Sequence, residues 1–105
     1  MLEIKNQDQF VAEVILASAP VFVDFWAPWC PPCLAFTPIF DEYSSLSDKY
    51  KCVKINVDEL KTIAGDFEIK SIPSILLFYK GSMVNRCVGV QSVDSLNEML
   101  NGILR

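Results

Sequence analysis

The sequence predicts an α/β fold in which a central mixed five-stranded sheet is flanked by four helices. Apolar runs of strand length alternate with segments of helical periodicity, and two further strand-like runs joined by a tight turn precede a last helical pattern. Alternating strands and helices favour parallel strands with helices on both faces, and the hairpin adds antiparallel pairing. With 105 residues, 51% of them apolar, the chain is expected to form a single domain, residues 1–105, with a substantial core.

The first half of the chain predicts two strands and two helices. Residues 2–4 are a short strand candidate, and Asn6 is placed to cap a helix over residues 7–18, where apolar side chains recur at helical spacing. Residues 21–26 are apolar on both faces of a strand, which is typical of a strand buried inside a sheet. A longer helix is expected over residues 32–49.

The second half predicts three strands and two helices. A buried strand over residues 52–57 is followed by a helix over residues 58–66, with Asp58 as its cap. Two apolar runs, residues 75–79 and 83–88, flank a tight turn and predict a hairpin. Ser92 is placed to cap a final helix. Its expected apolar face comprises Val93, Leu96, Leu100 and Ile103.

The net charge of −4 and the complete absence of histidine narrow the function classes. A nucleic-acid surface needs clustered Lys and Arg, which an acidic chain is not expected to provide. Without histidine the chain lacks the commonest metal ligand, so no metal is expected. No apolar run approaches the length of a membrane span, and the N-terminal residues lack the pattern of a secretory signal. These observations predict a cytoplasmic protein without nucleic-acid or membrane partners.

A pair of cysteines, Cys30 and Cys33, lies between the strand over residues 21–26 and the helix that follows. Two cysteines at this spacing can close a small disulfide ring or stand open as a dithiol. The dipoles and free N–H groups of a helix N-terminus favour an anionic sulfur, and the thiolate is the reactive form. A zinc site would be a structural use of the same pair, but zinc takes four ligands, and the chain offers one close pair, two isolated cysteines and no histidine. The placement therefore favours redox exchange.

The two remaining cysteines, Cys52 and Cys87, each stand alone in an apolar, strand-like segment. A free cysteine in such surroundings usually packs as a small hydrophobic side chain. The sequence leaves open which face of its strand Cys87 occupies. Because other strands separate theirs in the expected sheet, the two cysteines are predicted to remain free thiols that do not pair with each other.

The segment Phe25-Trp26-Ala27-Pro28-Trp29-Cys30-x-Pro32-Cys33 is accompanied by Ile72-Pro73-Ser74 and Val88-Gly89 further along the chain. In this combination the sequence closely resembles the thioredoxin family over essentially its whole length. The resemblance implies the thioredoxin fold and a thiol–disulfide oxidoreductase that reduces protein disulfides by dithiol–disulfide exchange. Cys30, at the helix start, is then expected to be the nucleophile, and Cys33, about one turn into the helix, the resolving thiol.

Asp24 interrupts a strand that is otherwise apolar on both faces, so its carboxyl is expected to be buried. Burial disfavours the charged form, which makes Asp24 a candidate proton carrier near the dithiol. The resemblance implies the same role, deprotonation of the resolving cysteine. Lys54, in the neighbouring strand, is the candidate partner of Asp24. Such a pair can be structural, can take part in proton transfer, or can do both.

The resemblance also implies a groove for a client protein. In the family the proline loop has a cis peptide and faces the cysteines, and the backbone before the proline pairs with the substrate chain like an added strand. No cofactor is expected to be bound. The resemblance implies recharging by a thioredoxin reductase that draws on NADPH, and disulfide-containing clients such as peroxiredoxins. The residues expected to contact substrate are Trp29, Pro31, Pro32, Ile72, Pro73, Val88 and Gly89.

Two positions depart from the family pattern. Pro31 stands where most thioredoxins have Gly, and Leu34 replaces the Lys or Arg that usually follows the second cysteine. The Cys-Pro-Pro-Cys sequence is similar to that of tryparedoxins and nucleoredoxins, which are larger proteins. The same fold also serves redox modules of the protein disulfide isomerase kind, and it could serve a non-enzymatic adaptor. The lack of His between the cysteines argues against an isomerase module, and the intact cysteine pair argues against an adaptor.

Overall fold

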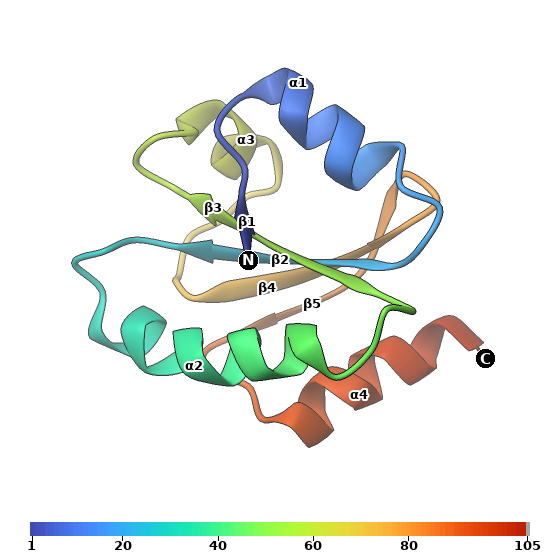
Figure 1. Ribbon diagram of the computed structural model, residues 1–105. Coiled ribbons are helices and arrows are strands. Elements are labelled where there is room, and N and C mark those ends of the chain that lie inside the picture. Colours follow the sequence, from blue (N-terminus) through green and yellow to red (C-terminus); the bar gives the residue numbers. More distant parts are fainter. Residues whose placement is uncertain (105) are drawn as a thin grey trace.

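The computed structural model describes residues 1–104, and its five strands form one mixed sheet in the order β1-β3-β2-β4-β5 (Figure 1). Strands β1, β3 and β2 run parallel, whereas β4 is antiparallel to both β2 and β5. The strands are β1 Leu2–Glu3, β2 Val21–Trp26, β3 Lys51–Asn56, β4 Ser74–Tyr79 and β5 Ser82–Val88. This sheet confirms the mixed five-stranded arrangement that the order of elements predicts.

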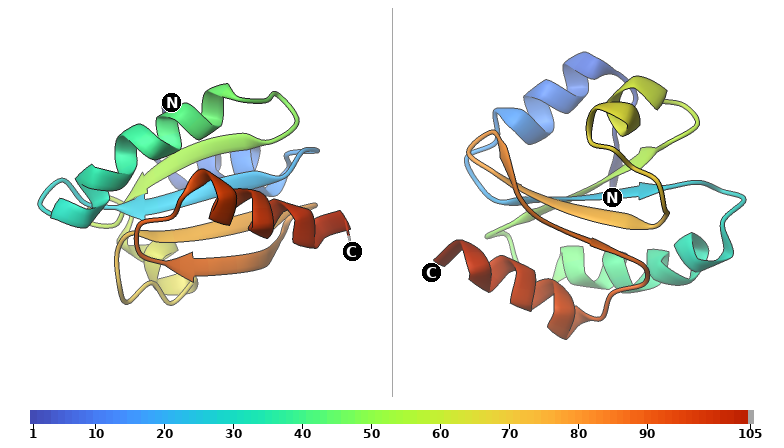
Figure 2. Two further views of the ribbon diagram at one scale, coloured as in Figure 1. Left: turned by 90° about the horizontal axis from the view of Figure 1, so that it is seen from below. Right: turned by 180° about the vertical axis from the view of Figure 1, so that it is seen from behind.

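Helices cover both faces of the sheet, as predicted. In Figure 1, α1 and α3 lie above the sheet and α2 and α4 below it, and the two views of Figure 2 agree with this layering. The helices are α1 Gln7–Phe10, continued by a π-helical segment η1 Val11–Ile15, α2 Pro31–Ser45, α3 Lys61–Asp66, and α4 Val93–Asn101, which is followed by a short 3-10 turn η2 Gly102–Leu104.

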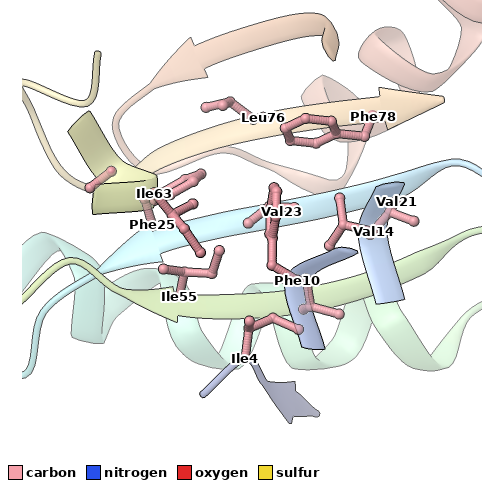
Figure 3. Packing of buried hydrophobic residues seen from close by; sticks show 12 residues of the cluster. Ile4, Phe10, Val14, Val21, Val23, Phe25, Ile55, Ile63, Leu76 and Phe78 are labelled. Carbon is pink, nitrogen blue, oxygen red and sulfur yellow. The ribbon is translucent and has the colours of Figure 1, made fainter. Parts of the chain in front are cut away.

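The central strand β2 contributes to a separate hydrophobic cluster on each face of the sheet. Val21, Val23 and Phe25 point toward α1 and α3 and pack there with side chains from β3, β4 and α1 (Figure 3). Phe22 points to the opposite face and packs against α2 and α4. Since side chains alternate along a strand, Asp24 shares the face of Phe22 and therefore lies on the α2 side of the sheet. Fully burying one such apolar side chain is worth about 1.5–3 kcal/mol, so β2 is a main source of stability.

The aromatic cluster between α2 and the sheet explains why this helix is shorter than the predicted range of residues 32–49. The carbonyl of Tyr43 accepts hydrogen bonds from the Leu46 N–H and from the Tyr50 hydroxyl. The ring centroids of Tyr43 and Tyr50 lie 4.5 Å apart in a stacked arrangement, so the chain that follows the helix folds back against it. A further α-helical turn would require the Tyr43 carbonyl for the residue four positions later. The helix therefore ends at Ser45.

Two of the three predicted helix caps, Asn6 and Ser92, are present, whereas Asp58 does not cap α3. Asn6 caps α1, with its side-chain oxygen accepting from the Gln9 N–H at 2.8 Å, and Ser92 caps α4 in the same way from the Ser95 N–H at 3.1 Å. The first helix ends at Ile15 and adopts π geometry from Val11, where the sequence predicts one regular helix to residue 18. The lengths of these helices also bear on membrane insertion: in the described residues, no helix is both long enough and apolar enough to cross a bilayer.

Candidate active site

One end of the sheet gathers the segments that the sequence analysis singles out. The carboxyl ends of β2, β3 and β5 and the start of β4 lie together at the left of Figure 1. The β2–α2, α3–β4 and β5–α4 loops therefore meet at this end, although they are far apart in the sequence. They carry Cys30, Pro73 and Gly89 respectively.

Cys30 and Cys33 form a disulfide across the first turn of α2, with their Cα atoms 5.2 Å apart. Cys30 is the N-cap residue of the helix, and its sulfur accepts a hydrogen bond from the Cys33 N–H at 3.2 Å. This is the donor expected of a helix start, where the first N–H groups have no partner within the helix. Pro31 and Pro32 occupy the first helical positions, where a missing N–H costs nothing. A thiolate on Cys30 is accordingly stabilised by an N–H group and the helix dipole.

The disulfide has its own small hydrophobic cluster. Cys30 is 4% exposed and Cys33 is completely buried, and both pack with Ala27. Trp26 and Ile72 pack against this cluster from the side. The Ile72 carbonyl oxygen lies 3.8 Å from the Cys30 sulfur, so the proline loop comes directly beside the outer of the two sulfur atoms.

The proline loop and the start of the β5–α4 loop are joined by a backbone hydrogen bond. The Ile72–Pro73 peptide is cis, as the resemblance implies. The Gly89 N–H donates to the Pro73 carbonyl at 2.8 Å. Gly89 has φ of +94°, a left-handed conformation that glycine adopts without steric cost. The structure therefore places Ile72 beside Cys30 and Gly89 beside Pro73, the next residue of the same loop.

The exposed part of this surface is apolar, with one correction to the expected patch. Trp29 is 66% exposed and Val88 57% exposed, whereas Ile72 is half-buried. Pro73 is buried rather than exposed, and its carbonyl is tied to Gly89, the residue after β5. The prolines between the cysteines, Pro31 and Pro32, are exposed, as is Leu34 at 52%.

Asp58 belongs to this site and not to a helix cap. Its carboxylate accepts a hydrogen bond from the Trp29 indole N–H at 2.6 Å, and α3 begins later, at Lys61. The Asp58 N–H is itself held by the Asn56 side chain at 2.9 Å. The signal available in the sequence was a carboxylate directly after a strand adjacent to β2, but the partner could not be identified without the fold. Asp58 thus orients the exposed indole beside Cys30.

Asp24 is completely buried, and neither of its carboxylate oxygens has a hydrogen-bond partner among the described residues. Burial raises the pKa of this carboxyl from its ordinary 3.8 to about 7, and the nearby charge of Lys54 opposes the increase. Lys54 lies directly opposite Asp24 in the β2–β3 register, with its ammonium 4.0 Å from the centre of the Trp26 ring. Asp24 therefore has a proton affinity matched to neutral pH.

Cys52 and Cys87 are free thiols in β3 and β5, and β2 and β4 separate their strands. Both pack in the cluster between the sheet and helices α2 and α4, and the Cys87 sulfur lies 3.3 Å from the Met99 sulfur. Burial raises the pKa of the Cys52 thiol to about 12 and raises that of Cys87 as well. In residues 1–104, no three or more Cys, Asp or Glu side chains are grouped so that they could hold a metal ion.

A cysteine pair at a helix N-terminus, beside a cis-proline loop and an exposed apolar surface, defines the class of thiol–disulfide oxidoreductases with protein-disulfide reductase activity. The chain belongs to the thioredoxin family, whose sequence model matches residues 1–102. It is 44% identical over 97 residues to thioredoxin of Rickettsia felis, covering 91% of this chain and 92% of that protein. It is 42% identical over 93 residues to thioredoxin 1 of Synechococcus elongatus, covering 88% and 87%. The solved structure of Plasmodium falciparum thioredoxin superposes with a TM-score of 0.88 at 26% identity, covering 96% of this chain and 98% of that one.

Proposed function

We propose that Cys30 is the nucleophile and Cys33 the resolving thiol when this protein reduces client disulfides. The observation that carries the assignment is the Cys33 N–H, which donates to the Cys30 sulfur at the start of α2. In the first step the Cys30 thiolate attacks one client sulfur, a mixed disulfide forms, and the other client sulfur leaves as a thiolate that takes up a proton. In the second step the Cys33 thiolate attacks Cys30, the internal disulfide closes, and the second client thiolate leaves. Two electrons pass from the dithiol to the client.

Asp24 is the proposed proton acceptor for Cys33. It lies on the α2 face of the sheet, two residues before Trp26, whose side chain packs against the cluster that contains Cys33. Cys33 is completely buried, so bulk water is poorly placed to remove its proton. A carboxyl with a pKa of about 7 is deprotonated often enough at neutral pH to accept one. Lys54 tunes this affinity through its charge, because a cation favours the carboxylate form.

The client is proposed to lie across Trp29, Pro31, Pro32, Ile72, Pro73, Val88 and Gly89. Membership in the family implies a reductase and disulfide-bearing clients as partners in general. The finer assignments proposed here are a thioredoxin reductase that draws on NADPH, with no cofactor bound to this chain, and peroxiredoxins among the clients. A reducing compartment, the cytoplasm, fits the two free thiols that the same chain retains, Cys52 and Cys87.

The test couples the protein to a purified thioredoxin reductase and follows NADPH oxidation with insulin as the disulfide client. We expect consumption of NADPH that needs all three proteins and stops with Cys30→Ser. Cys52→Ser serves as the matched control, since it removes a thiol far from the start of α2, and should retain the rate. If a chemical dithiol supports insulin reduction but the reductase does not, the assigned electron donor is wrong.

A further inference from the structure

The side chain of Gln91, in the loop between β5 and α4, binds the backbone of Val88 and Gly89. We call this segment, which borders the proposed groove, the groove wall. Its amide nitrogen Nε2 donates to the Val88 carbonyl at 3.3 Å and to the Gly89 carbonyl at 3.1 Å. Its amide oxygen Oε1 accepts from the Ser95 hydroxyl. Backbone carbonyls can only accept, so these partners define which end of the amide faces the wall. The side chain therefore spans from the wall to the helix.

This contact completes a chain of hydrogen bonds from the proline loop to α4. The Gly89 N–H donates to the Pro73 carbonyl at 2.8 Å, so the wall is attached on its other side to the loop beside Cys30. Ser95 lies in the first turn of α4, where its N–H donates to the Ser92 cap at 3.1 Å. The first turn of α4 thus anchors one end of the amide, and Gln91 links the wall to it.

Besides the pairing of Val88 with Ser74 in the sheet and the bond from Gly89 to Pro73, little side-chain packing holds the wall in shape. Val88 is 57% exposed and Val90 is 45% exposed, so apolar packing restrains this segment little. Gly89 lies between them at φ of +94°, and glycine is the residue with the greatest backbone freedom. A side-chain amide that binds two successive carbonyls restricts that freedom directly.

We infer that Gln91 is a positioning residue for client docking, which fixes the Val88–Gly89 wall relative to Cys30 and the Pro73 loop. The inference rests on the proposed function, in which a client segment lies between these two loops. A client chain that pairs with the groove needs its wall preorganised, because ordering the wall on binding would weaken the interaction. The dithiol itself has no contact with Gln91 among the described interactions, so its chemistry should not depend on this residue.

The test compares the rates at which reduced variants react with a protein disulfide, insulin, and with a small one, Ellman's reagent, which does not fill the groove. Gln91→Ala should lower the rate constant with insulin about fivefold, the effect of losing one net hydrogen bond, and change that with Ellman's reagent less than about twofold. In saturation experiments the insulin effect should fall on KM and not on kcat. Gln91→Glu is the matched variant, since it keeps the length and the acceptor for Ser95 but loses the donor. It should be as slow with insulin as Gln91→Ala.

Ser95→Ala removes only the anchor of the amide and should give a smaller loss with insulin. Urea unfolding of each variant checks the fold, and Gln91→Glu and Ser95→Ala carry the test if Gln91→Ala does not fold. A Gln91→Glu protein with the wild-type insulin rate would overturn the inference, as would a parallel loss with both disulfides, which would indicate an altered dithiol. A wild-type protein that reacts with Ellman's reagent but not with insulin would instead overturn the proposed function.

Discussion

The four cysteines of this chain occupy two kinds of environment that differ less in burial than in hydrogen bonding. Cys30 is 4% exposed and Cys52 is 7% exposed, while Cys87 is more exposed than either. Cys30 nevertheless receives an N–H group at a helix start, whereas the thiols in the strands are surrounded by apolar side chains and a thioether. A thiolate needs stabilisation that apolar surroundings cannot supply, so burial raises the pKa of both strand thiols.

Exposure alone does not identify a reactive cysteine in this fold. The half-buried Cys87 has no helix N-terminus and no donor on its sulfur among the described hydrogen bonds, where it instead contacts Met99. The nearly buried Cys30 has both, and it lies beside an exposed apolar surface that includes Trp29. Reactivity is therefore expected to follow local hydrogen-bond donors and access to a client.

The largest effect on activity is expected when either cysteine of the Cys30–Cys33 pair is replaced. Cys30→Ser should abolish insulin reduction, because the serine hydroxyl is not ionised at neutral pH. Cys33→Ser should instead accumulate a mixed disulfide with the client through Cys30, since no thiol is present to resolve it. Mass spectrometry of the trapped species identifies the linked residue. A client attached through Cys33 in the Cys30→Ser protein, at the rate of the wild type, would reverse the two roles.

The buried Asp24 predicts the next largest effect, on stability. The folded pKa, about 7, lies above the ordinary 3.8, so the folded state binds more protons between these pH values, and wild-type stability falls as pH rises through them. Asp24→Asn removes this loss. Its gain in free energy of unfolding should be small near pH 4 and reach at most about 4 kcal/mol above about pH 7. Urea unfolding of both proteins at acidic and alkaline pH measures it, and a gain independent of pH would contradict the titration of Asp24.

The same substitution tests the proton-transfer role. With no carboxylate to accept the proton of Cys33, Asp24→Asn should slow release of the client from the mixed disulfide near neutral pH, and the defect should shrink as pH approaches the ordinary thiol pKa of about 8.5. Stopped-flow measurement of the release step from about pH 6 to 9 gives the profile. Equal rates for the two proteins throughout would leave Asp24 with a structural role only.

A smaller difference is expected between the alkylation rates of the two cysteines in strands, Cys52 and Cys87. In the oxidised, folded protein, alkylation should label Cys87 faster than Cys52, by about tenfold or more, because Cys87 is more accessible and the Cys52 thiol has a pKa of about 12. Peptide mass mapping after a timed reaction with iodoacetamide gives both rates. Faster labelling of Cys52 would show that β3 opens more readily than the edge strand β5.

The smallest expected effect concerns Pro31, inside the reactive pair. Two prolines between the cysteines restrict the open dithiol, so closing the disulfide loses less entropy than it would with glycine there. Pro31→Gly should therefore raise the reduction potential, by no more than about 30 mV, which corresponds to about 1.4 kcal/mol for a two-electron couple. Titration of both proteins against glutathione measures the difference. A lower potential in the glycine variant would mean that thiolate stabilisation, not loop entropy, dominates.

Much of the site could be predicted because its signals are local in the sequence. The spacing of Cys30 and Cys33, the apolar strand before them and the prolines between them predict a redox cysteine pair at a helix start without reference to the rest of the fold. The same holds for Asn6 and Ser92, whose side chains cap helices that begin at the next residue. The order of the strands and helices was sufficient for the mixed sheet, since short connections leave few arrangements that bury both faces of β2.

Local sequence accounts for the chemistry of the chain, because a reactive dithiol at a helix start and a buried carboxyl in an apolar strand can each be inferred from adjacent residues. Only the tertiary structure showed which groups far apart in the sequence meet: Asp58 with the Trp29 indole, and the Gly89 N–H with the Pro73 carbonyl. It also showed that Pro73 is buried while Trp29 and Val88 on the same surface are exposed. These contacts join loops that the sheet brings to one end, and a hydrogen bond between groups far apart in the sequence leaves no periodic or compositional trace in either segment.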